Sequence, residues 1–172
     1  LQQYNFEEFS VINDVIVALV NGTDKENGIV LVAGTGSNCF GENEQGQAAK
    51  ASGYDYLLTD QGSGYELGLK AMKAAVKSFD GRGPKTVLEQ KVCDYFKVED
   101  ISQLKTQVYQ PDLKKSEIAQ LALLVFEGFD QQDPVCQKLV SQASQELWLM
   151  VSTVAQRLDL TETDFDLVLE GS

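Results

Sequence analysis

Apolar residues follow two different periods along the chain, and the change of period separates a strand-rich first third from a helical remainder. Residues 28–33 (GIVLVA) form a continuous apolar run, which is typical of a strand buried on both faces. The surrounding pattern predicts a strand end at residues 9–12 and a helix over residues 14–20 that is begun by Asn13 or Asp14. It predicts two further strands at residues 38–42 and 47–51.

Beyond residue 64 the apolar positions recur at helical spacing. The first helix is predicted over residues 65–79, with an apolar stripe of Tyr65, Leu69, Met72, Val76 and Phe79. Further helices are predicted over residues 86–96, 100–108, 116–129 and 134–158. Residues 164–170 then return as a strand. We therefore expect a single domain over residues 1–172, with an α/β fold in which helices flank a mixed sheet and the second half is largely helical.

Composition narrows the class of function. The chain has 172 residues, 26 acids, 14 bases and a net charge of −12, which argues against nucleic-acid or membrane partners because both require a basic face. It has no histidine, so Ser-His-Asp catalysis and His-ligated zinc are excluded within it. Its three cysteines are widely spaced, which favours free thiols in the cytoplasm. We expect neither a signal peptide nor a membrane span.

The turn that follows the apolar strand is a candidate phosphate site. In Gly34-Thr35-Gly36-Ser37-Asn38 several backbone N–H groups can point one way, and the glycines allow a phosphate to approach closely. The turn is not a Walker A loop, because no Gly-Lys-Ser/Thr follows. The alternative interpretation is a plain hairpin turn.

Two other segments carry candidate chemistry. Asp14, at a strand-to-helix junction, is suited to accept the proton of a hydroxyl that attacks a γ-phosphate; the alternative is a helix cap. Asp60 lies in the glycine-rich residues 53–64, where a loop can bind sugar hydroxyls or simply connect elements at the surface. Three tyrosines nearby are predicted either to stack on a sugar or to fill core, namely Tyr54, Tyr56 and Tyr65.

In this order, the motifs resemble the BadF/BadG/BcrA/BcrD-type ATPase family, specifically its N-acetylglucosamine kinase branch. The resemblance covers nearly the whole chain and rests on residues 13–14 (ND), 28–38 (GIVLVAGTGSN), 43–46, 53–64, 116–122 and 133–136. It implies one lobe, C-terminal, of a two-lobed actin-like ATPase with a ribonuclease H-like fold. It also implies that ATP and Mg²⁺ serve to phosphorylate the 6-hydroxyl of an amino sugar between this lobe and a missing N-terminal lobe.

The resemblance assigns roles to single residues. Asp14 resembles the catalytic base, and Gly34, Thr35 and Gly36 resemble a phosphate-binding turn. Gly171 resembles the first residue of the adenosine-binding turn. No residue is expected to ligate a metal directly. The protein is expected to be cytoplasmic, and a homodimer is compatible with the resemblance.

The sugar-binding positions are Gly36, Asn38, Gly53 and Asp60 by the same resemblance. The chain departs from the family nearby. Tyr54 replaces a usual tryptophan, and Thr59-Asp60-Gln61-Gly62 replaces Gly-Asp-Glu-Gly. Ser172 also replaces a second glycine after Gly171. Losing the glutamate at Gln61 removes one acceptor for a sugar hydroxyl, which leaves the exact sugar open.

Two alternatives to a sugar kinase stay open. The departures from the family pattern are compatible with a sensor that binds a sugar or nucleotide without catalysis, because fold does not fix function. An ATPase that activates an iron–sulfur dehydratase is the second alternative, although it requires a cysteine pair to hold the cluster. We interpret the chain as a segment of a longer protein, and we expect the segment alone to be inactive because both lobes are needed to position the phosphate.

Overall fold

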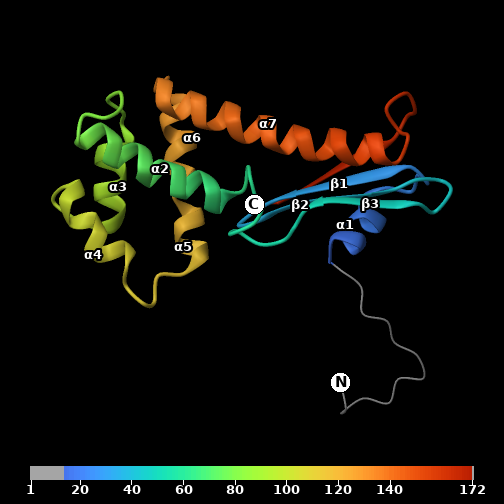
Figure 1. The fold of residues 1–172 in the computed structure, drawn as a ribbon, viewed down its shortest axis with the longest axis horizontal. Coiled ribbons are helices and arrows are strands. Elements are labelled where there is room, and N and C mark those ends of the chain that lie inside the picture. The colour runs from blue at the N-terminus through green and yellow to red at the C-terminus, as the bar shows by residue number, and fades with distance from the viewer. Residues whose placement is uncertain (1–13, 172) are drawn as a thin grey trace, which may run out of the picture.

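The computed structural model describes residues 14–171, so the predicted strand end at residues 9–12 and the alternative cap Asn13 lie outside the described residues. Figure 1 shows a sheet and a group of helices side by side, with the long helix α7 (Pro134–Arg157) running across both. The two halves have separate hydrophobic cores, each of which receives side chains from α7.

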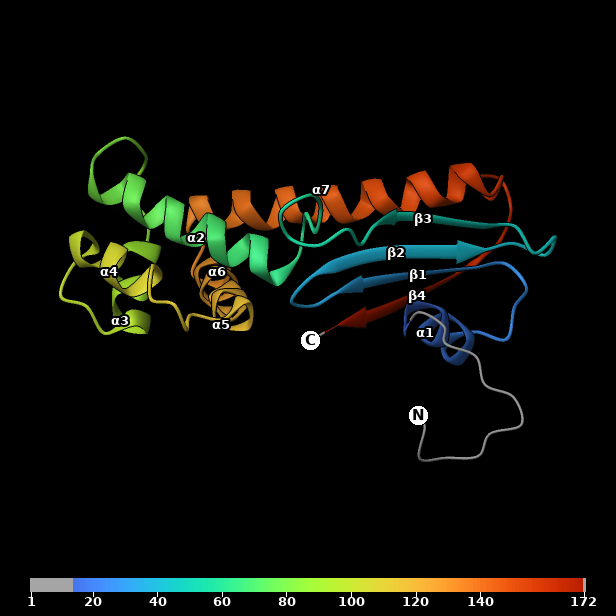
Figure 2. The ribbon, with the colours of Figure 1, turned by 60° about the horizontal axis from the view of Figure 1, so that its bottom comes forward.

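The sheet has the order β3-β2-β1-β4, as Figure 2 shows. Its strands are β1 (Gly28–Ala33), β2 (Ser37–Glu42), β3 (Ala48–Ser52) and β4 (Asp166–Gly171). β1 pairs antiparallel with β2 and parallel with β4. The carboxyl ends of β1 and β4 therefore meet at one edge, the location where open α/β sheets bind ligands.

Helices cover both faces of the sheet (Figure 1). Val30 packs with α1 (Asp14–Gly22) on one face, whereas Ile29 and Leu31 pack with α7 on the other. Because both faces are covered, the first four residues of β1 are all buried, which explains the continuous apolar run in the sequence. Within residues 14–171, the predicted strands and the helix predicted over residues 14–20 are confirmed to within two residues at their ends.

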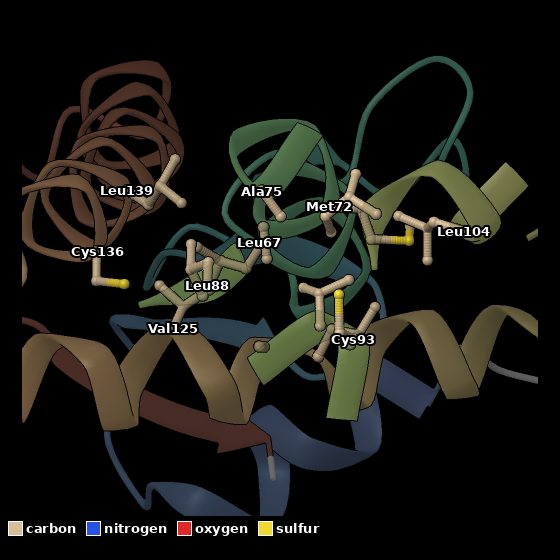
Figure 3. Close-up of a cluster of buried hydrophobic side chains, with 14 of the residues drawn as sticks. Leu67, Met72, Ala75, Leu88, Cys93, Leu104, Val125, Cys136 and Leu139 are labelled. Carbon is tan, nitrogen blue, oxygen red and sulfur yellow. The ribbon is translucent and has the colours of Figure 1, made fainter. Parts of the chain in front are cut away.

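The helical half has its own core, shown in Figure 3 with Leu67, Leu88 and Val125 among the buried side chains. The core is enclosed by α7 together with α2 (Gly64–Phe79), α3 (Leu88–Phe96), the 3₁₀ turn η1 (Ile101–Gln103), α4 (Leu104–Val108), α5 (Lys115–Gln120) and α6 (Ala122–Asp130). The helix predicted over residues 86–96 starts at Leu88, because Thr86 and Val87 donate hydrogen bonds to the Asp133 carboxylate, each at 3.0 Å.

The predicted apolar stripe of α2 is only partly confirmed, because Leu69, Met72 and Val76 pack on the core whereas Phe79 is exposed. Of the five residues in that stripe only Met72 is buried, and Phe79 is 45% exposed. The buried face carries mostly small residues, Leu67, Gly68, Ala71, Ala75 and Ser78. The reason is the close crossing of α5, where a Cβ on Gly68 would collide with the carbonyl oxygen of Ile118. Small side chains let two helix backbones approach, and apolar spacing alone does not reveal such a neighbour.

The single helix predicted over residues 116–129 is also wrong, since two helices, α5 and α6, meet at Leu121. The Leu121 N–H bonds the Ile118 carbonyl, and the Leu124 N–H bonds the Leu121 carbonyl, both at 3.1 Å. This spacing of three residues is that of a 3₁₀ turn, which tightens the chain and redirects it. The predicted helix over residues 100–108 is likewise divided, into η1 and α4.

The three cysteines are free thiols, as the sequence predicts, and the structure shows that all three are buried. Burial raises the pKa of Cys39 and of Cys136 to about 12, so neither is a reactive thiolate at neutral pH. Of the helices described between residues 14 and 171, none combines the length and the apolar character that crossing a bilayer requires.

Candidate active site

The turn between β1 and β2 is fixed from behind by the start of α2. The N–H groups of Gly64 and Tyr65 donate to the carbonyls of Gly34 and Thr35 at 2.8 and 3.2 Å. Within residues 14–171, no group accepts a hydrogen bond from the N–H of Thr35 or of Gly36. Two backbone donors of the turn are thus available to an anion such as a phosphate.

Gly36 lies directly against the carboxylate of Asp60. A Cβ at Gly36 would be 2.7 Å from Asp60 Oδ2, so only glycine allows this approach. Asp60 is 4% exposed, and its N–H donates to Ser52 Oγ at 3.2 Å. The structure therefore brings a buried carboxylate beside the candidate phosphate turn.

Gly53 makes a similar approach to Asn38. Its φ of +74° favours glycine, and a Cβ there would be 2.7 Å from Asn38 Oδ1. Asn38 Oδ1 is buried and has no hydrogen-bond partner in the part of the chain that the structure describes. Buried polar atoms are nearly always paired, so a ligand N–H or O–H would complete this site.

The loop that carries Asp60 has an unusual backbone. Ser52, Asp55 and Asp60 all have left-handed φ values, of 69°, 71° and 65°. Such conformations cost free energy in non-glycine residues and cluster at functional sites. Hydrogen bonds within the loop support them, including one of 2.8 Å from the Tyr54 N–H to Thr59 Oγ1. Two positions that depart from the family pattern thus bond each other.

A pocket of about 470 Å³ collects these groups. Its lining includes every predicted site residue except Gly171, namely Asp14, Gly34, Thr35, Gly36, Asn38, Gly53 and Asp60. The volume suits a small molecule. Asp55 and Glu170 add two more carboxylates, so the walls offer many hydrogen-bond acceptors to hydroxyl and amide groups.

Asp14 combines both roles considered for it. It is exposed at the first position of α1 and lines the pocket. Its Oδ1 also accepts a hydrogen bond of 2.8 Å from the Val15 N–H, as a helix-start carboxylate does. The helix contact uses Oδ1 and orients the carboxylate at the pocket wall.

Gly171 lies outside this pocket, opposite Ala33 at the end of β4. A Cβ at Gly171 would collide with the Ala33 carbonyl oxygen, so the two strand ends touch. Its neighbour Glu170 does line the pocket. The predicted contact of Gly171 with adenosine stays a prediction.

Comparison with known proteins agrees with this geometry. A family model described as the BadF/BadG/BcrA/BcrD ATPase family matches residues 2–172. The chain belongs to this family. It is 38% identical over 161 residues to the N-acetylmuramic acid/N-acetylglucosamine kinase of Clostridium acetobutylicum. It is 33% identical over 166 residues to the N-acetyl-D-glucosamine kinase of Dictyostelium discoideum.

These alignments cover 94% and 95% of the chain but 53% and 52% of the relatives. The chain thus spans about half the length of the curated relatives it matches. A candidate N-acetylglucosamine kinase from Chromobacterium violaceum superposes with a TM-score of 0.73 at 25% identity, over 92% of this chain and 51% of that one. One from Porphyromonas gingivalis gives 0.62 at 19% identity, over 89% and 50%. The predicted actin-like ATPase fold of a mixed sheet with flanking helices is confirmed.

A second pocket in this BadF-type ATPase chain lies on the other side of the turn. It has a volume of about 490 Å³ and shares Gly34 and Thr35 with the first. The rest of its lining comes largely from α5, α6 and α7, including Ser116, Ala119, Gln120, Phe126, Ala143 and Leu147. Sequence reasoning noted residues 116–122 as part of the family pattern but gave them no role, because helical residues facing a pocket have no distinctive spacing.

Sequence reasoning also missed Lys115, the first residue of α5. Its Nζ lies 2.7 Å from Asp55 Oδ1 and 3.2 Å from Asp60 Oδ2. Burial alone would lower the pKa of Lys115, but hydrogen bonds to Asp55 and Asp60 outweigh that effect and raise it. The hydrogen bond from Lys115, with one from the Tyr56 N–H, lowers the pKa of Asp55. The sequence contains no signal that distinguishes Lys115 from its neighbour Lys114.

The tyrosines near the pocket do not fill core. Tyr54 is 64% exposed and Tyr56 is 40% exposed, so that alternative is wrong for both. The ring of Tyr56 packs edge-on against Tyr65, with centroids 4.9 Å apart. The Lys115 ammonium lies 4.9 Å from the Tyr56 centroid and 5.8 Å from that of Tyr65, where the ring faces attract a cation.

Proposed function

We propose that this chain is part of an ATP-dependent kinase that phosphorylates the 6-hydroxyl of an amino sugar, with N-acetylglucosamine as the preferred acceptor. The observation that carries the proposal is the convergence, in one pocket, of the Thr35 and Gly36 N–H donors, the Asp14 carboxylate and the unpaired Asn38 oxygen. The names of the two curated relatives, both N-acetylglucosamine kinases, support the same class of acceptor.

In the proposed reaction, Asp14 accepts the proton of the sugar hydroxyl. The oxygen of that hydroxyl forms a bond to the γ-phosphorus of ATP. The bond between that phosphorus and the β–γ bridging oxygen breaks, and ADP leaves. Charge on the transferred phosphoryl oxygens is stabilised by the N–H groups of Thr35 and Gly36, which are already oriented by the turn. Asp60 and Asn38 accept hydrogen bonds from the sugar and hold it in line for attack.

The second pocket is our assignment for the nucleoside of ATP. Both pockets share the Gly34-Thr35 turn. Phosphates bound at this turn would therefore lie between the sugar in the first pocket and the nucleoside in the second. Its apolar lining, with Leu67, Leu123 and Phe126, suits a purine ring. Ala33 also lines it, and Gly171 pairs with Ala33, which is consistent with a role for Gly171 beside adenosine.

Mg²⁺ is proposed to enter with ATP. It is commonly bound through nucleotide phosphates and one or two carboxylates while it keeps several waters. Glu170 is a carboxylate that lines the pocket at the turn and fits such a role. When bound, the ion neutralises phosphate charge. Among the described residues, no group of three or more His, Cys, Asp or Glu forms a metal site of its own.

The rest of the protein is proposed to supply the second lobe, since the chain spans about half of its relatives. Closure of that lobe would exclude water from the transferred phosphate. We propose a cytoplasmic location, where buried free thiols remain reduced. The homodimer stays a prediction.

The test uses the complete protein with ATP and Mg²⁺. ADP release is followed with N-acetylglucosamine, N-acetylmannosamine, glucosamine and glucose in turn. Stimulation by N-acetylglucosamine above the others, together with a phosphorylated 6-hydroxyl in the product, supports the proposal. Sugar binding without any sugar-dependent ADP release would contradict it and would identify a sensor instead.

A further inference from the structure

Lys115 joins elements of both pockets. Among residues 14–171 it is the one cation that forms ion pairs with carboxylates lining the first pocket, Asp55 and Asp60. It is also the first residue of α5, and the residues that follow it, Ser116, Ala119 and Gln120, line the second pocket.

We propose that Lys115 is a positioning residue for the acceptor sugar. It holds the carboxylate of Asp60 against Gly36, and Asp60 in turn binds the sugar. This inference rests on the proposed function, in which Asp60 binds the sugar. Lys115 itself does not line the first pocket, so it acts through Asp60 rather than by touching the acceptor.

The two ion pairs of Lys115 are unequal. The Asp55 side chain is 69% exposed, so its pair with Lys115 is screened by solvent and contributes little. The Asp60 side chain is 6% exposed, and a charged carboxylate that is so buried requires a partner. The pairing with Asp60 is therefore the one on which the pocket depends.

Lys115 contacts one oxygen of Asp60 and leaves the other available. Nζ bonds Oδ2, the oxygen that also lies nearest to the Cβ position of Gly36. No residue in the described part of the chain donates a hydrogen bond to Oδ1. With Oδ2 held, Oδ1 has a fixed direction and can accept from a sugar hydroxyl without first ordering the side chain.

The lysine is itself held in place. Its ammonium lies near the rings of Tyr56 and Tyr65, and its backbone begins a helix that crosses α2 without a gap. That crossing is closed by Gly68, where a Cβ would collide with the Ile118 carbonyl. The position of Lys115 is thus set by contact between two helix backbones, which is a rigid support for a binding group.

The experiment compares the complete wild-type protein with Lys115→Met, Lys115→Arg and Lys114→Met. Lys114 is the adjacent, exposed lysine and forms no ion pair in the described residues, so it is a matched control. The values of kcat, of KM for N-acetylglucosamine and of KM for ATP are measured, together with Tm. Because Asp60 would contact the sugar equally before and during transfer, the effect should fall on the sugar KM.

For Lys115→Met we expect the sugar KM to rise about 10- to 100-fold, while the ATP KM and kcat stay within about threefold. Lys115→Arg should recover most of the loss, because a guanidinium can also bond a carboxylate. Lys114→Met should match wild type. A sugar KM within threefold of wild type in Lys115→Met, equal rises in both KM values, or no recovery with arginine would each overturn the inference.

If Lys115→Met does not fold, Lys115→Gln also removes the positive charge that pairs with Asp60 and carries the same expectation. Absence of sugar-dependent ADP release in wild type would contradict the proposed function instead. Calorimetric titration of N-acetylglucosamine into wild type and Lys115→Met then still decides the positioning role. A wild-type protein that does not bind the sugar would overturn both.

Discussion

Glycine has different uses at the first pocket and in the helical core. At the pocket, polar oxygens of Asp60 and Asn38 lie too close to Gly36 and Gly53 for a Cβ to fit. In the helical half, the Cβ position of Gly68 is occupied by the carbonyl of another helix, and that of Gly128 by the Cys136 sulfur. Glycine therefore makes room for binding groups at the pocket and for close packing in the helical core. The two cases differ in the kind of atom that lies next to the position of the missing side chain.

The largest expected effect is at the pocket, where a substitution should abolish activity without lowering stability. In the complete protein, Asp14→Asn should lower kcat by about 10²- to 10⁴-fold, because it removes the proposed base. Asparagine keeps an oxygen for the Val15 N–H, so Tm should stay within about 2 °C of wild type. Steady-state ADP release and a thermal melt measure the two quantities. A variant that retains wild-type kcat would return Asp14 to a purely capping role.

The opposite behaviour is expected from the helical core. Leu88 is fully buried, and Leu88→Ala should lower the free energy of unfolding by about 2–5 kcal/mol. Leu88 lines neither pocket, so the substitution should leave kcat/KM of the folded protein within about twofold. Urea unfolding provides the measurement. Leu149→Ala, at a position that is 58% exposed, is the control and should change stability by about 0.5 kcal/mol or less.

Matched glycine substitutions test the contrast most directly. Gly36→Ala forces the Asp60 carboxylate to move, and we expect the affinity for N-acetylglucosamine to fall about tenfold, or about 1.4 kcal/mol. Gly68→Ala should instead lower stability by about 1–3 kcal/mol by forcing α2 away from α5. Calorimetry and urea unfolding are applied to both. If Gly36→Ala lost stability but bound the sugar normally, Gly36 would be required for close packing and not for sugar binding.

The smallest effect concerns pH and the start of α7. Burial favours the neutral form of Asp133, but hydrogen bonds from the N–H groups of Cys136 and Val87 and from the Thr86 hydroxyl outweigh it and lower its pKa. A lowered pKa stabilises the fold above the usual aspartate pKa of about 3.9 and loses that contribution as pH falls below it. Asp133→Asn should cost about 1–2 kcal/mol at pH 7.

The cost of Asp133→Asn should shrink below about pH 4, because the unfolded wild-type chain then binds a proton that the folded carboxylate, with its lowered pKa, does not yet bind. Urea unfolding of both proteins at pH 7 and near pH 3.5 measures the difference. A constant gap at the two pH values would show that the shape of the side chain, and not its charge, stabilises the start of α7.

The sheet and its turn could be predicted because their signals are local. The apolar run of β1 and the glycine turn after it are contiguous, and a buried strand followed by such a turn has few structural alternatives. Most of the candidate site follows from this, since Gly34, Thr35, Gly36 and Asn38 lie in or beside one turn. The remaining groups that line the pocket, Asp14, Gly53 and Asp60, could be assigned to it only through the order of family motifs.

Features that depend on contacts between distant segments could not be predicted. The buried face of α2 is set by α5, which lies some fifty positions later in the chain, and residue spacing within α2 does not contain that information. Lys115 is equivalent to Lys114 in sequence and differs only in what it contacts. The second pocket is likewise formed by faces of four helices, α2, α5, α6 and α7, that approach one another only in the fold.

The pairing of β1 with β4 has a consequence for the synthesis of the protein. Gly28 lies opposite Asp166, so β1, β2 and β3 leave the ribosome long before the strand that completes the sheet. Until then one edge of an apolar strand is open, and open edges are templates for aggregation. Pairing over such a separation is also slow. A nascent chain that stalls within α7 would therefore expose the most apolar strand of the sheet, and it is at this stage that the protein would most need a chaperone.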